Sequence, residues 1–377
     1  MNSPGFAFTI VAFLLVIGPL IFIHELGHYF AGRWFGVKAD TFSIGFGREI
    51  TGWTDRRGTR WKVGWLPLGG YVKFAGDMNP ASTPSDEWLS LPADERAQTF
   101  QAKKLWQRFI IVAAGPLTNF LFAILAFMII FAAVGYPTTP AYVGRVDAGT
   151  AAAAAGFRAG DQVVGVDGNT IATFADLQGY IALRPDQHMA FTVRRGGREI
   201  ALEATTRAEM RDDGFGNRSR VGLLGIRPGG ALEFAPLPLS RLPGTAIKTT
   251  AGIVESMVVA LGQVVTGRRS VQELGGPLKI AQVSGQQASL GWLPFFWLMI
   301  MVSINLGFNN LLPIPLLDGG HLLFYVVEGV RRKPLKPAAQ EWAFRTGLAV
   351  LLALMIFVTF NDLASFGLFS GLGRLIG

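Results

Sequence analysis

Long uncharged stretches alternate with charged, turn-rich stretches along the chain. Four stretches contain no Asp, Glu, Lys or Arg and are long enough, or nearly so, to cross roughly 30 Å of hydrocarbon; they are residues 6–23, 109–136, 290–317 and 346–361. The pattern predicts a polytopic α-helical membrane protein with four transmembrane helices. We interpret residues 6–23 as a permanent helix, because no basic segment precedes them and no small-residue cleavage site follows.

Composition and charge support a membrane protein. Half of the 377 residues are hydrophobic, with 29 Phe against 6 Tyr, which is too apolar for a soluble protein of this length. The net charge of +8 would suggest a nucleic-acid partner in a soluble protein. Here segment 33–108, between the first two spans, carries 12 of the 34 Lys and Arg residues, and the short loop 331–336 carries four; the positive-inside rule places both in the cytoplasm. The expected partner is therefore the lipid bilayer and no nucleic acid.

This charge pattern also predicts the topology. With residues 33–108 and 331–336 inside, both termini and the region between the second and third spans lie outside. The absence of cysteine excludes disulfides and a cysteine nucleophile.

Residues 40–76 follow a strand pattern. The sequence REITGWTDRRGTRWKVGWLPLGGYVKF alternates apolar and polar residues on both sides of a turn at 55–58, which predicts a β-hairpin. Trp53, Trp61, Trp65 and Tyr71 would place it in the membrane interface, where aromatic rings are favoured. An ordinary cytoplasmic hairpin is the alternative.

Residues 140–207 have the composition of a small soluble module. Short β-branched runs are separated by Gly and Asp turns, with one helix expected around residues 174–183, so a mixed α/β module is predicted. The stretch AGFRAGDQVVGVDG at 155–168 resembles a PDZ domain. The resemblance implies that a backbone loop receives a peptide C-terminus; the matching residues are Tyr142, Val143, Gly144, Arg145 and Val146. A module that acts only as a steric cap is the alternative.

Residues 208–288 predict a strand at 221–226 and amphipathic helices. In segment 247–265, apolar residues recur at helical spacing, interrupted by Glu255 and Gln263. A fifth span here would move residues 331–336 outside, against the charge rule. We therefore expect this helix on the outer surface or against the other spans.

The first uncharged stretch ends in the sequence HELGH. Histidines at positions i and i+4 lie on one face of a helix, so His24 and His28 can bind one zinc ion through neutral imidazoles. Glu25 follows the first histidine and is placed to act as the catalytic base. Ionisable groups at hydrocarbon depth are costly and usually functional. The pattern therefore predicts a catalytic zinc site.

A catalytic zinc ion usually has a third protein ligand. Among the acidic residues, Asp318 directly follows a long uncharged stretch, near the inner end of the third span, where His24 and His28 also lie if the first helix runs inward. His321, three residues later, is the rival ligand or a partner of a ligand.

The backbone around Asp318 is predicted to be irregular. Pro313 and Pro315 break the helix just before it, and two glycines follow it. Such backbone within a membrane must line a cavity or be packed in protein. Three amides precede the break and offer substrate contacts or interhelical hydrogen bonds; they are Asn305, Asn309 and Asn310.

Several motifs together resemble the site-2 protease family. They are HELGH at 24–28, GFG at 45–47, GGYVK at 69–73, AGPLTNF at 114–120 and NLLPIPLLDGGH at 310–321. The nearest likeness is to the bacterial branch of the regulator of sigma-E protease, although that branch often has two PDZ domains and this chain has room for one.

The resemblance implies one zinc ion held by His24, His28 and Asp318, with Glu25 as base and the hairpin as a membrane re-entrant edge for unwound substrate. The expected substrate contacts are Asn310, Asn305, Pro315, Gly69, Gly70 and Tyr71.

The predicted function is an intramembrane zinc metalloprotease of the bacterial inner membrane. Its partners would be single-span proteins, such as an anti-sigma factor or remnant signal peptides, that were already cut on the outer side. An ion-coupled transporter could use Asp318 and the broken third helix, and a PDZ scaffold could use the soluble module alone. The first leaves HELGH unexplained, and the second predicts no metal.

The chain is accordingly divided into seven segments. They are the first span (1–36), the hairpin region (37–104), the second span (105–137), the PDZ-like module (138–207), an outer strand and amphipathic helices (208–288), the third span (289–330), and a cytoplasmic loop with the fourth span (331–377).

Overall fold

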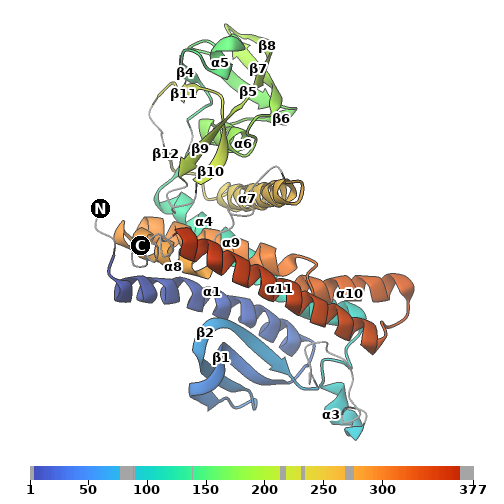
Figure 1. Cartoon of the computed structure of the whole chain (residues 1–377). Helices are drawn as coiled ribbons and strands as arrows, with labels where there is room; N and C mark the ends of the chain where they lie inside the picture. Colours follow the sequence, from blue (N-terminus) through green and yellow to red (C-terminus); the bar gives the residue numbers. More distant parts are fainter. Residues whose placement is uncertain are drawn as a thin grey trace, which may run out of the picture. The chain divides into compact units, whose positions relative to one another are not determined.

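The computed structural model describes residues 4–76, 88, 90–137, 139–212, 218–230, 234–267 and 276–365 (Figure 1). The chain forms two compact units. The first comprises Met1–Leu125 and Gly276–Gly377, and the second comprises Ala126–Gly275. Each unit is described by itself.

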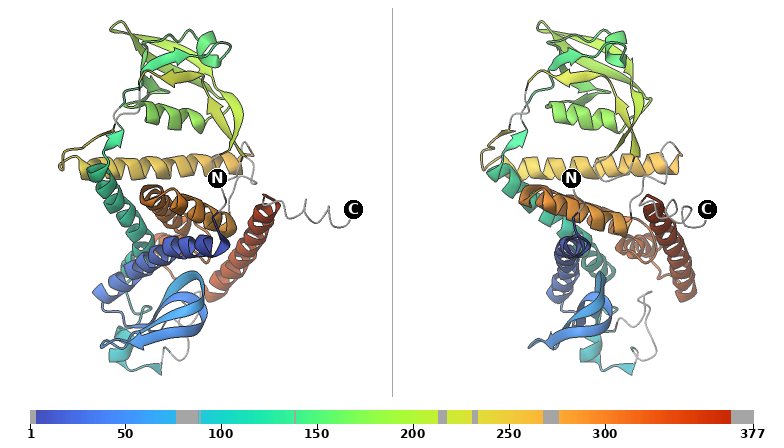
Figure 2. Two further views of the ribbon diagram at one scale, coloured as in Figure 1. Left: turned by 90° about the vertical axis from the view of Figure 1, so that its left-hand side faces the viewer. Right: turned by 60° about the vertical axis from the view of Figure 1, so that its left-hand side comes forward.

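The first unit is built from helices and one sheet. The helices are α1 (Phe6–Trp34), α3 (Ala93–Ala97), most of α4 (Leu105–Ala133), α8 (Pro277–Ser289), α9 (Trp292–Leu311), α10 (Asp318–Arg331) and α11 (Pro337–Ser365). The sheet contains β1 (Ala39–Thr54) and β2 (Arg60–Phe74), and Figure 2 shows it beside α1.

Five helices among the described residues are long and apolar enough to cross a membrane. Four of them, α1, α4, α9 and α11, cover all or most of the four uncharged stretches of the sequence. The fifth is α7 (Leu242–Val265), which was expected as an amphipathic surface helix. The chain is an integral membrane protein, and the count of four spans stays a prediction.

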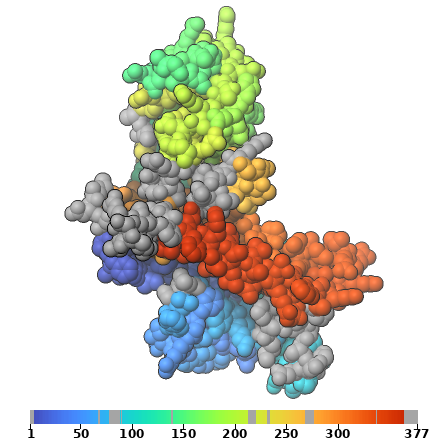
Figure 3. Space-filling view, viewed as in Figure 1, coloured from blue at the N-terminus to red at the C-terminus, as the bar shows by residue number. Residues whose placement is uncertain are grey.

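The outermost helix of the first unit is strongly apolar on its surface. On α11 the exposed side chains include Leu352, Met355, Ile356 and Phe360. Figure 3 shows this helix in red on the front of the unit. An apolar exposed helical face of this length is suited to lipid rather than water.

The predicted hairpin is present, and its strands fold over each other. Residues 39–44 pair on one side with residues 60–63 and on the other with residues 70–74, while residues 51–54 pair again with residues 60–63. The bends lie at glycines with positive φ, including Gly45 and Gly69, where other residues are strained. The result leaves residues 70–74 as one edge of the sheet.

The sheet packs on the C-terminal half of α1. Phe42 stacks on Trp61 with ring centroids 4.3 Å apart, and both rings contact Tyr29 of α1 edge to face. These aromatic contacts hold the sheet against α1.

Helix α8 was not expected to belong to the helical bundle. It packs along α1, where a methyl group on Gly285 would lie 2.6 Å from Oγ1 of Thr9. The buried carboxylate of Asp362, on α11, accepts hydrogen bonds from the N–H groups of Gly276 and Lys279, which lie at the N-terminus of α8. Anionic groups are favourable at this end of a helix, so α11 fixes α8 against α1.

The second unit contains an α/β module and α7. Its strands are β3 (Tyr136–Pro137), β4 (Val143–Val146), β5 (Gln162–Val166), β6 (Asn169–Thr170), β7 (His188–Arg195), β8 (Arg198–Thr205), β9 (Arg207–Asp212), β10 (Arg218–Leu223), β11 (Ile226–Pro228) and β12 (Phe234–Ala235). Its short helices are α5 (Ala151–Ala154) and α6 (Phe174–Ala182). The strand order β6-β5-β7-β8 forms the main sheet, and α6 covers its core through Leu177 and Ile181.

The module extends past the boundary predicted at residue 207. Strand β11 pairs antiparallel with β4, and β10 lies against α6. Strand β3, where the chain enters, pairs with β12, where it leaves. The boundary is missed because these strand pairings join segments 80 residues apart for β4 with β11 (146 to 226) and 97 residues apart for β3 with β12 (137 to 234), which local composition does not report.

Candidate metal centre

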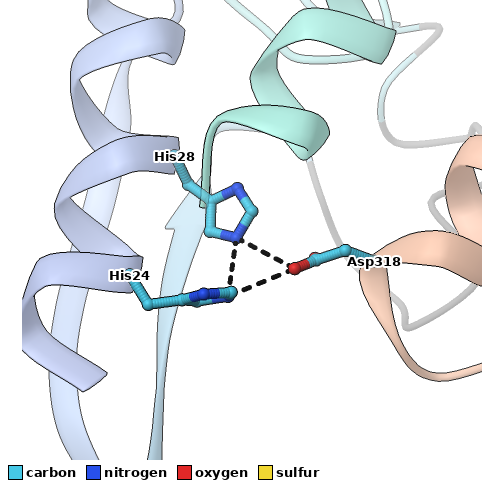
Figure 4. A group of neighbouring side chains, drawn as sticks. All are labelled: His24, His28 and Asp318. Atoms are coloured by element: carbon cyan, nitrogen blue, oxygen red, sulfur yellow. Dashed lines mark hydrogen bonds and ion pairs between the residues drawn. The ribbon is translucent and has the colours of Figure 1, made fainter. Parts of the chain in front are cut away.

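The HELGH motif lies within one continuous helix, α1. His24 and Glu25 are both 7% exposed, although they carry ionisable side chains. Because i and i+4 share a helical face, both histidine rings point to the same side, towards the start of α10 (Figure 4).

Asp318 meets the two histidines across the bundle. Its Oδ2 atom lies 3.1 Å from Nε2 of His24 and 3.5 Å from Nε2 of His28, and the two Nε2 atoms are 3.3 Å apart. In the described part of the chain, these three residues form the one cluster of metal-ligating side chains. His321 lies outside the cluster, with its ring 5.1 Å from that of Phe344.

The spacing of the three donor atoms fits a zinc ion. Zinc with four ligands at about 2.0–2.1 Å has about 3.3–3.4 Å between neighbouring ligand atoms in a tetrahedron. The three observed separations, 3.1, 3.3 and 3.5 Å, bracket this value. The buried Oδ2 of Asp318 also lacks a correctly angled hydrogen bond among the described residues. The donor set is therefore suited to a cation.

Helix α4 shapes the space around the second histidine. Nδ1 of His28 lies 2.9 Å from the main-chain oxygen of Ile111, which can accept a hydrogen bond from Nδ1–H. A methyl group on Gly115 would lie 2.2 Å from Nε2 of His28. The glycine therefore leaves room for the ring at the position where the donor atoms meet.

The same helix also reaches the first histidine. The side chain of Asn119 is completely buried, and its amide lies 3.1 Å from Nδ1 of His24. The close approach of the helices depends on Gly27, where a methyl group would lie 2.4 Å from the main-chain oxygen of Ala114.

These contributions of α4 were not predicted from sequence. The motif AGPLTNF marked the resemblance, but no role followed for Gly115 or Asn119. The available signal was an amide within an uncharged stretch, since polar side chains at membrane depth usually have a partner.

The backbone before Asp318 is irregular, as predicted. Helix α9 ends at Leu311 and α10 begins at Asp318, whose carboxylate lies at the favourable N-terminal end of α10. Between them, Leu316 has a φ of +87°, a rare conformation for a residue with a side chain. A methyl group on Gly319 would lie 2.2 Å from the main-chain oxygen of Leu312, so the turn requires this glycine.

Glu25 contacts the edge strand of the sheet. The main-chain N–H of Val72 faces its carboxylate. A methyl group on Gly70 would lie 3.0 Å from Cγ of Glu25 and 2.8 Å from Cγ2 of Ile21. The two glycines expected to contact substrate thus lie in the segment that touches the expected base.

The other expected substrate residues are less tightly placed. Asn309 donates a hydrogen bond of 2.6 Å to Asn305, and both side chains are exposed on α9. Asn310 is half-buried near the end of α9, and Tyr71 stacks on Phe46. A methyl group on Gly347 would lie 2.5 Å from the main-chain oxygen of Pro315, so this proline packs on α11.

The expected peptide-binding residues of the PDZ-like module are not among those that line its groove, although Asp147 and β11, next to them, are. Residues 143–146 form β4, which pairs with β11. Tyr142, just before β4, forms an isolated bridge with Gln162 of β5. The groove, with a volume of about 830 Å³, is lined instead by residues of α6, β9 and β10, including Leu177, Ile181 and Val221.

Comparison with known proteins decides the family. The model of peptidase family M50 matches residues 12–354. The chain belongs to peptidase family M50. The M50 match covers both the HELGH motif and Asp318, and it confirms the site-2 protease resemblance and the prediction of a zinc metalloprotease.

Individual M50 relatives are similar over nearly their whole length. "Putative zinc metalloprotease Atu1380" of Agrobacterium fabrum is 43% identical over 361 residues, which are 94% of this chain and 96% of the relative. "Metalloprotease MmpA" of Caulobacter vibrioides is 39% identical over 396 residues, covering 98% and 99%.

A solved PDZ domain of an SdrC-like protein from Listeria monocytogenes matches 24% of this chain and 87% of its own length, at 20% identity and a TM-score of 0.20. At that score the likeness carries no argument.

Proposed function

We propose that the chain hydrolyses peptide bonds within the transmembrane segments of single-span proteins, with one catalytic zinc ion held by His24, His28 and Asp318. One observation carries this proposal: three donor atoms from two helices converge at 3.1–3.5 Å beside Glu25, inside a bundle of membrane-length helices. A transporter or a scaffold would have no need of a base beside such a cluster.

Glu25 is the residue that moves protons. Zinc, when bound, supplies a Lewis acid that makes water nucleophilic near neutral pH and polarises the peptide carbonyl. Glu25 takes a proton from the attacking water and returns it to the leaving amine. The N–H of Val72 faces its carboxylate, and Gly70, two residues earlier, leaves space for the Glu25 side chain.

The edge strand next to Glu25 binds the substrate in an extended form. Residues 70–74 are paired with β1 on one side only, within the described residues. Backbone groups of alternate strand residues point to the same edge. Since the N–H of Val72 points to Glu25, the N–H and C=O of Gly70 face the same way and can pair with substrate.

This pairing addresses the main obstacle to cutting a transmembrane helix. In a helix the backbone carbonyls are engaged in internal hydrogen bonds, and in lipid they cannot be released without replacement. An added strand supplies those hydrogen bonds. Gly69 and Tyr71 flank the pairing residue, and Asn310, Asn305 and Pro315 contact substrate from the side of α9.

The proposed orientation follows the distribution of charge. Segments 33–108 and 331–336 lie in the cytoplasm, and the termini and the PDZ-like module lie outside, in the bacterial inner membrane. The module excludes substrates with bulky outer domains until a first cut has removed them. Its groove beside α6, or the backbone at Tyr142–Val146, is where a new C-terminus would bind.

Zinc content and cleavage measured on the same purified samples test the proposal. We expect Glu25→Gln to retain one zinc ion per chain and to lose cleavage of a model single-span substrate that lacks its outer domain. His24→Ala should lose both zinc and cleavage. Full zinc content in His24→Ala, or loss of zinc in Glu25→Gln, would contradict the assigned roles.

A further inference from the structure

We infer that Asn119 is a positioning residue for the metal: its side-chain oxygen accepts a hydrogen bond from Nδ1–H of His24 and so leaves Nε2 of that ring free to bind zinc. The inference rests on the proposed zinc site. It adds a role for α4, which contributes no ligand.

The starting observation is an unmatched pair of polar atoms. Nδ2 of Asn119 lies 3.1 Å from Nδ1 of His24, while Oδ1 of the same buried amide has no hydrogen-bond partner among the described residues. The pair is fully enclosed, and 95 residues separate its members in the sequence. A buried acceptor without a donor is costly, so the arrangement requires an explanation.

The chemistry of imidazole decides which amide atom faces the ring. A neutral histidine that binds metal through Nε2 carries its proton on Nδ1. That N–H needs an acceptor, and an amide NH₂ group cannot accept. If Asn119 donated to Nδ1 instead, Nε2 would carry the proton and could not be a ligand.

A half-turn of the amide resolves the conflict. The oxygen and nitrogen of an asparagine side chain exchange places on rotation by 180° with almost no change in shape. After this rotation Oδ1 faces Nδ1–H of His24 and gains the donor that it lacks. The distance of 3.1 Å is suitable for this hydrogen bond.

The two histidines are then held in the same way by one helix. Nδ1 of His28 lies 2.9 Å from the main-chain oxygen of Ile111, and Nδ1 of His24 faces Asn119. Both contacts favour the tautomer with Nε2 bare. Helix α4 is itself anchored at this point, because Oγ of Ser303 donates a 3.0 Å hydrogen bond to the main-chain oxygen of Asn119.

A purely structural role predicts a different outcome. If Asn119 only joined α4 to α1, its replacement would lower the stability of the protein whether or not metal was bound. Zinc affinity would change no more than in another variant that removes a buried hydrogen bond nearby. Ser303→Ala provides this comparison, because Ser303 is fully buried and does not touch a histidine in the described structure.

The test measures zinc affinity by competition with a chromophoric chelator, in full-length protein carrying Glu25→Gln so that self-cleavage plays no part. We expect Asn119→Leu to raise the dissociation constant for zinc by about 10- to 100-fold. Asn119→Asp keeps an acceptor towards His24, and we expect it to stay within about tenfold of the parent, as Ser303→Ala should.

The inference is overturned if Asn119→Leu changes the dissociation constant by less than about tenfold, or if Asn119→Asp weakens binding by more than that. Should Asn119→Leu fail to fold, Asn119→Ala takes its place with the same expected change and the same threshold, because alanine also offers no acceptor to Nδ1–H. If His24→Ala retains zinc, the proposed site itself fails. If His24→Ala loses zinc and Asn119→Leu keeps it, only the role of Asn119 fails.

Discussion

Gly115 and His28 cannot both keep their positions if Gly115 gains a side chain. The added methyl group would lie 2.2 Å from Nε2 of His28, the atom assigned to the metal. We therefore expect Gly115→Ala to displace the ring and to lower zinc retention and cleavage by at least about tenfold, as does a lost orienting contact.

The matched control for this substitution is Gly18→Ala in α1. No atom lies within 4 Å of the position that its methyl group would take. Zinc content and cleavage of this variant should equal those of the parent. Equal behaviour of the Gly115 and Gly18 variants would show that the helix spacing adapts and that the glycine is not required.

Asp318→Asn should weaken zinc retention at comparable expression, because an amide is a poorer ligand than a carboxylate. His321→Ala should retain zinc, since its ring packs on Phe344 and lies outside the donor cluster. Metal analysis after dialysis against a weak chelator measures both. Zinc loss in His321→Ala together with zinc retention in Asp318→Asn would show that His321 is the third ligand.

The PDZ-like module should lose stability in acid through one buried ion pair. Asp161 is fully buried, and Arg195 donates two hydrogen bonds to it, of 2.6 and 2.8 Å. Burial raises the pKa of Asp161, but the hydrogen bonds and charge of Arg195 outweigh it and hold the pKa below its usual value. The contribution is therefore complete above the unfolded pKa of about 3.9 and is lost as the pH falls through the lower folded value.

Hydrogen exchange of β5 and β7 in the full-length protein measures this effect after correction for intrinsic exchange. At pH 7, Asp161→Asn should lower protection by about 1–3 kcal/mol, and the difference from the parent should shrink near pH 3. Glu199→Gln is the control, because its pair with Arg194 is exposed and should contribute at most about 0.5 kcal/mol. A pH-independent effect of Asp161→Asn would refute the linkage.

Topology can be tested with reporters at two sites. A reporter fused after Lys333 should be cytoplasmic, and one inserted near Gly196, in the turn between β7 and β8, should be external. The opposite result after Lys333 would mean that α7 crosses the membrane as a fifth span. A cytoplasmic location of the reporter at Gly196 would mean that the predicted inside and outside segments are reversed.

Removal of the module should broaden substrate choice without stopping catalysis. Replacing residues 140–229 by a short flexible linker is feasible, because Pro137 pairs with Phe234 and the two ends are therefore adjacent. We expect the variant to cleave both a truncated and a full-length substrate, whereas the parent cleaves only the truncated one. A variant that is folded and zinc-loaded but cuts neither would show that the module helps to build the active site.

The sequence predicted those elements that depend on residues close together in the chain. The uncharged stretches predicted α1, α4, α9 and α11, because helix length and hydropathy report membrane spans directly. HELGH and the segment before Asp318 were found because ionisable groups and prolines are costly in such surroundings. The structure places His24, His28 and Asp318 in one cluster, and their role as zinc ligands stays a prediction.

The parts that were missed depend on contacts between distant segments. The partner of His24 lies 95 residues away, and the uncharged stretch around Asn119 shows that this amide needs a partner but not which residue it is. Strand β11 closes the module on β4 from beyond its predicted end. Helix α8 has a polar composition, and only its packing through Gly285 shows that it belongs with α1.

The pairing of β3 with β12 brings together the two points at which the chain enters and leaves the module, so the module is an insertion between them. Whatever lies between Pro137 and Phe234, these strands keep the end of α4 and the start of the segment leading to α7 at a fixed separation. A longer, shorter or duplicated outer region could therefore be exchanged at this point while the helices keep their register. Under the proposed function, in which this module selects substrates, selectivity can thus change over evolution independently of the chemistry that cuts them.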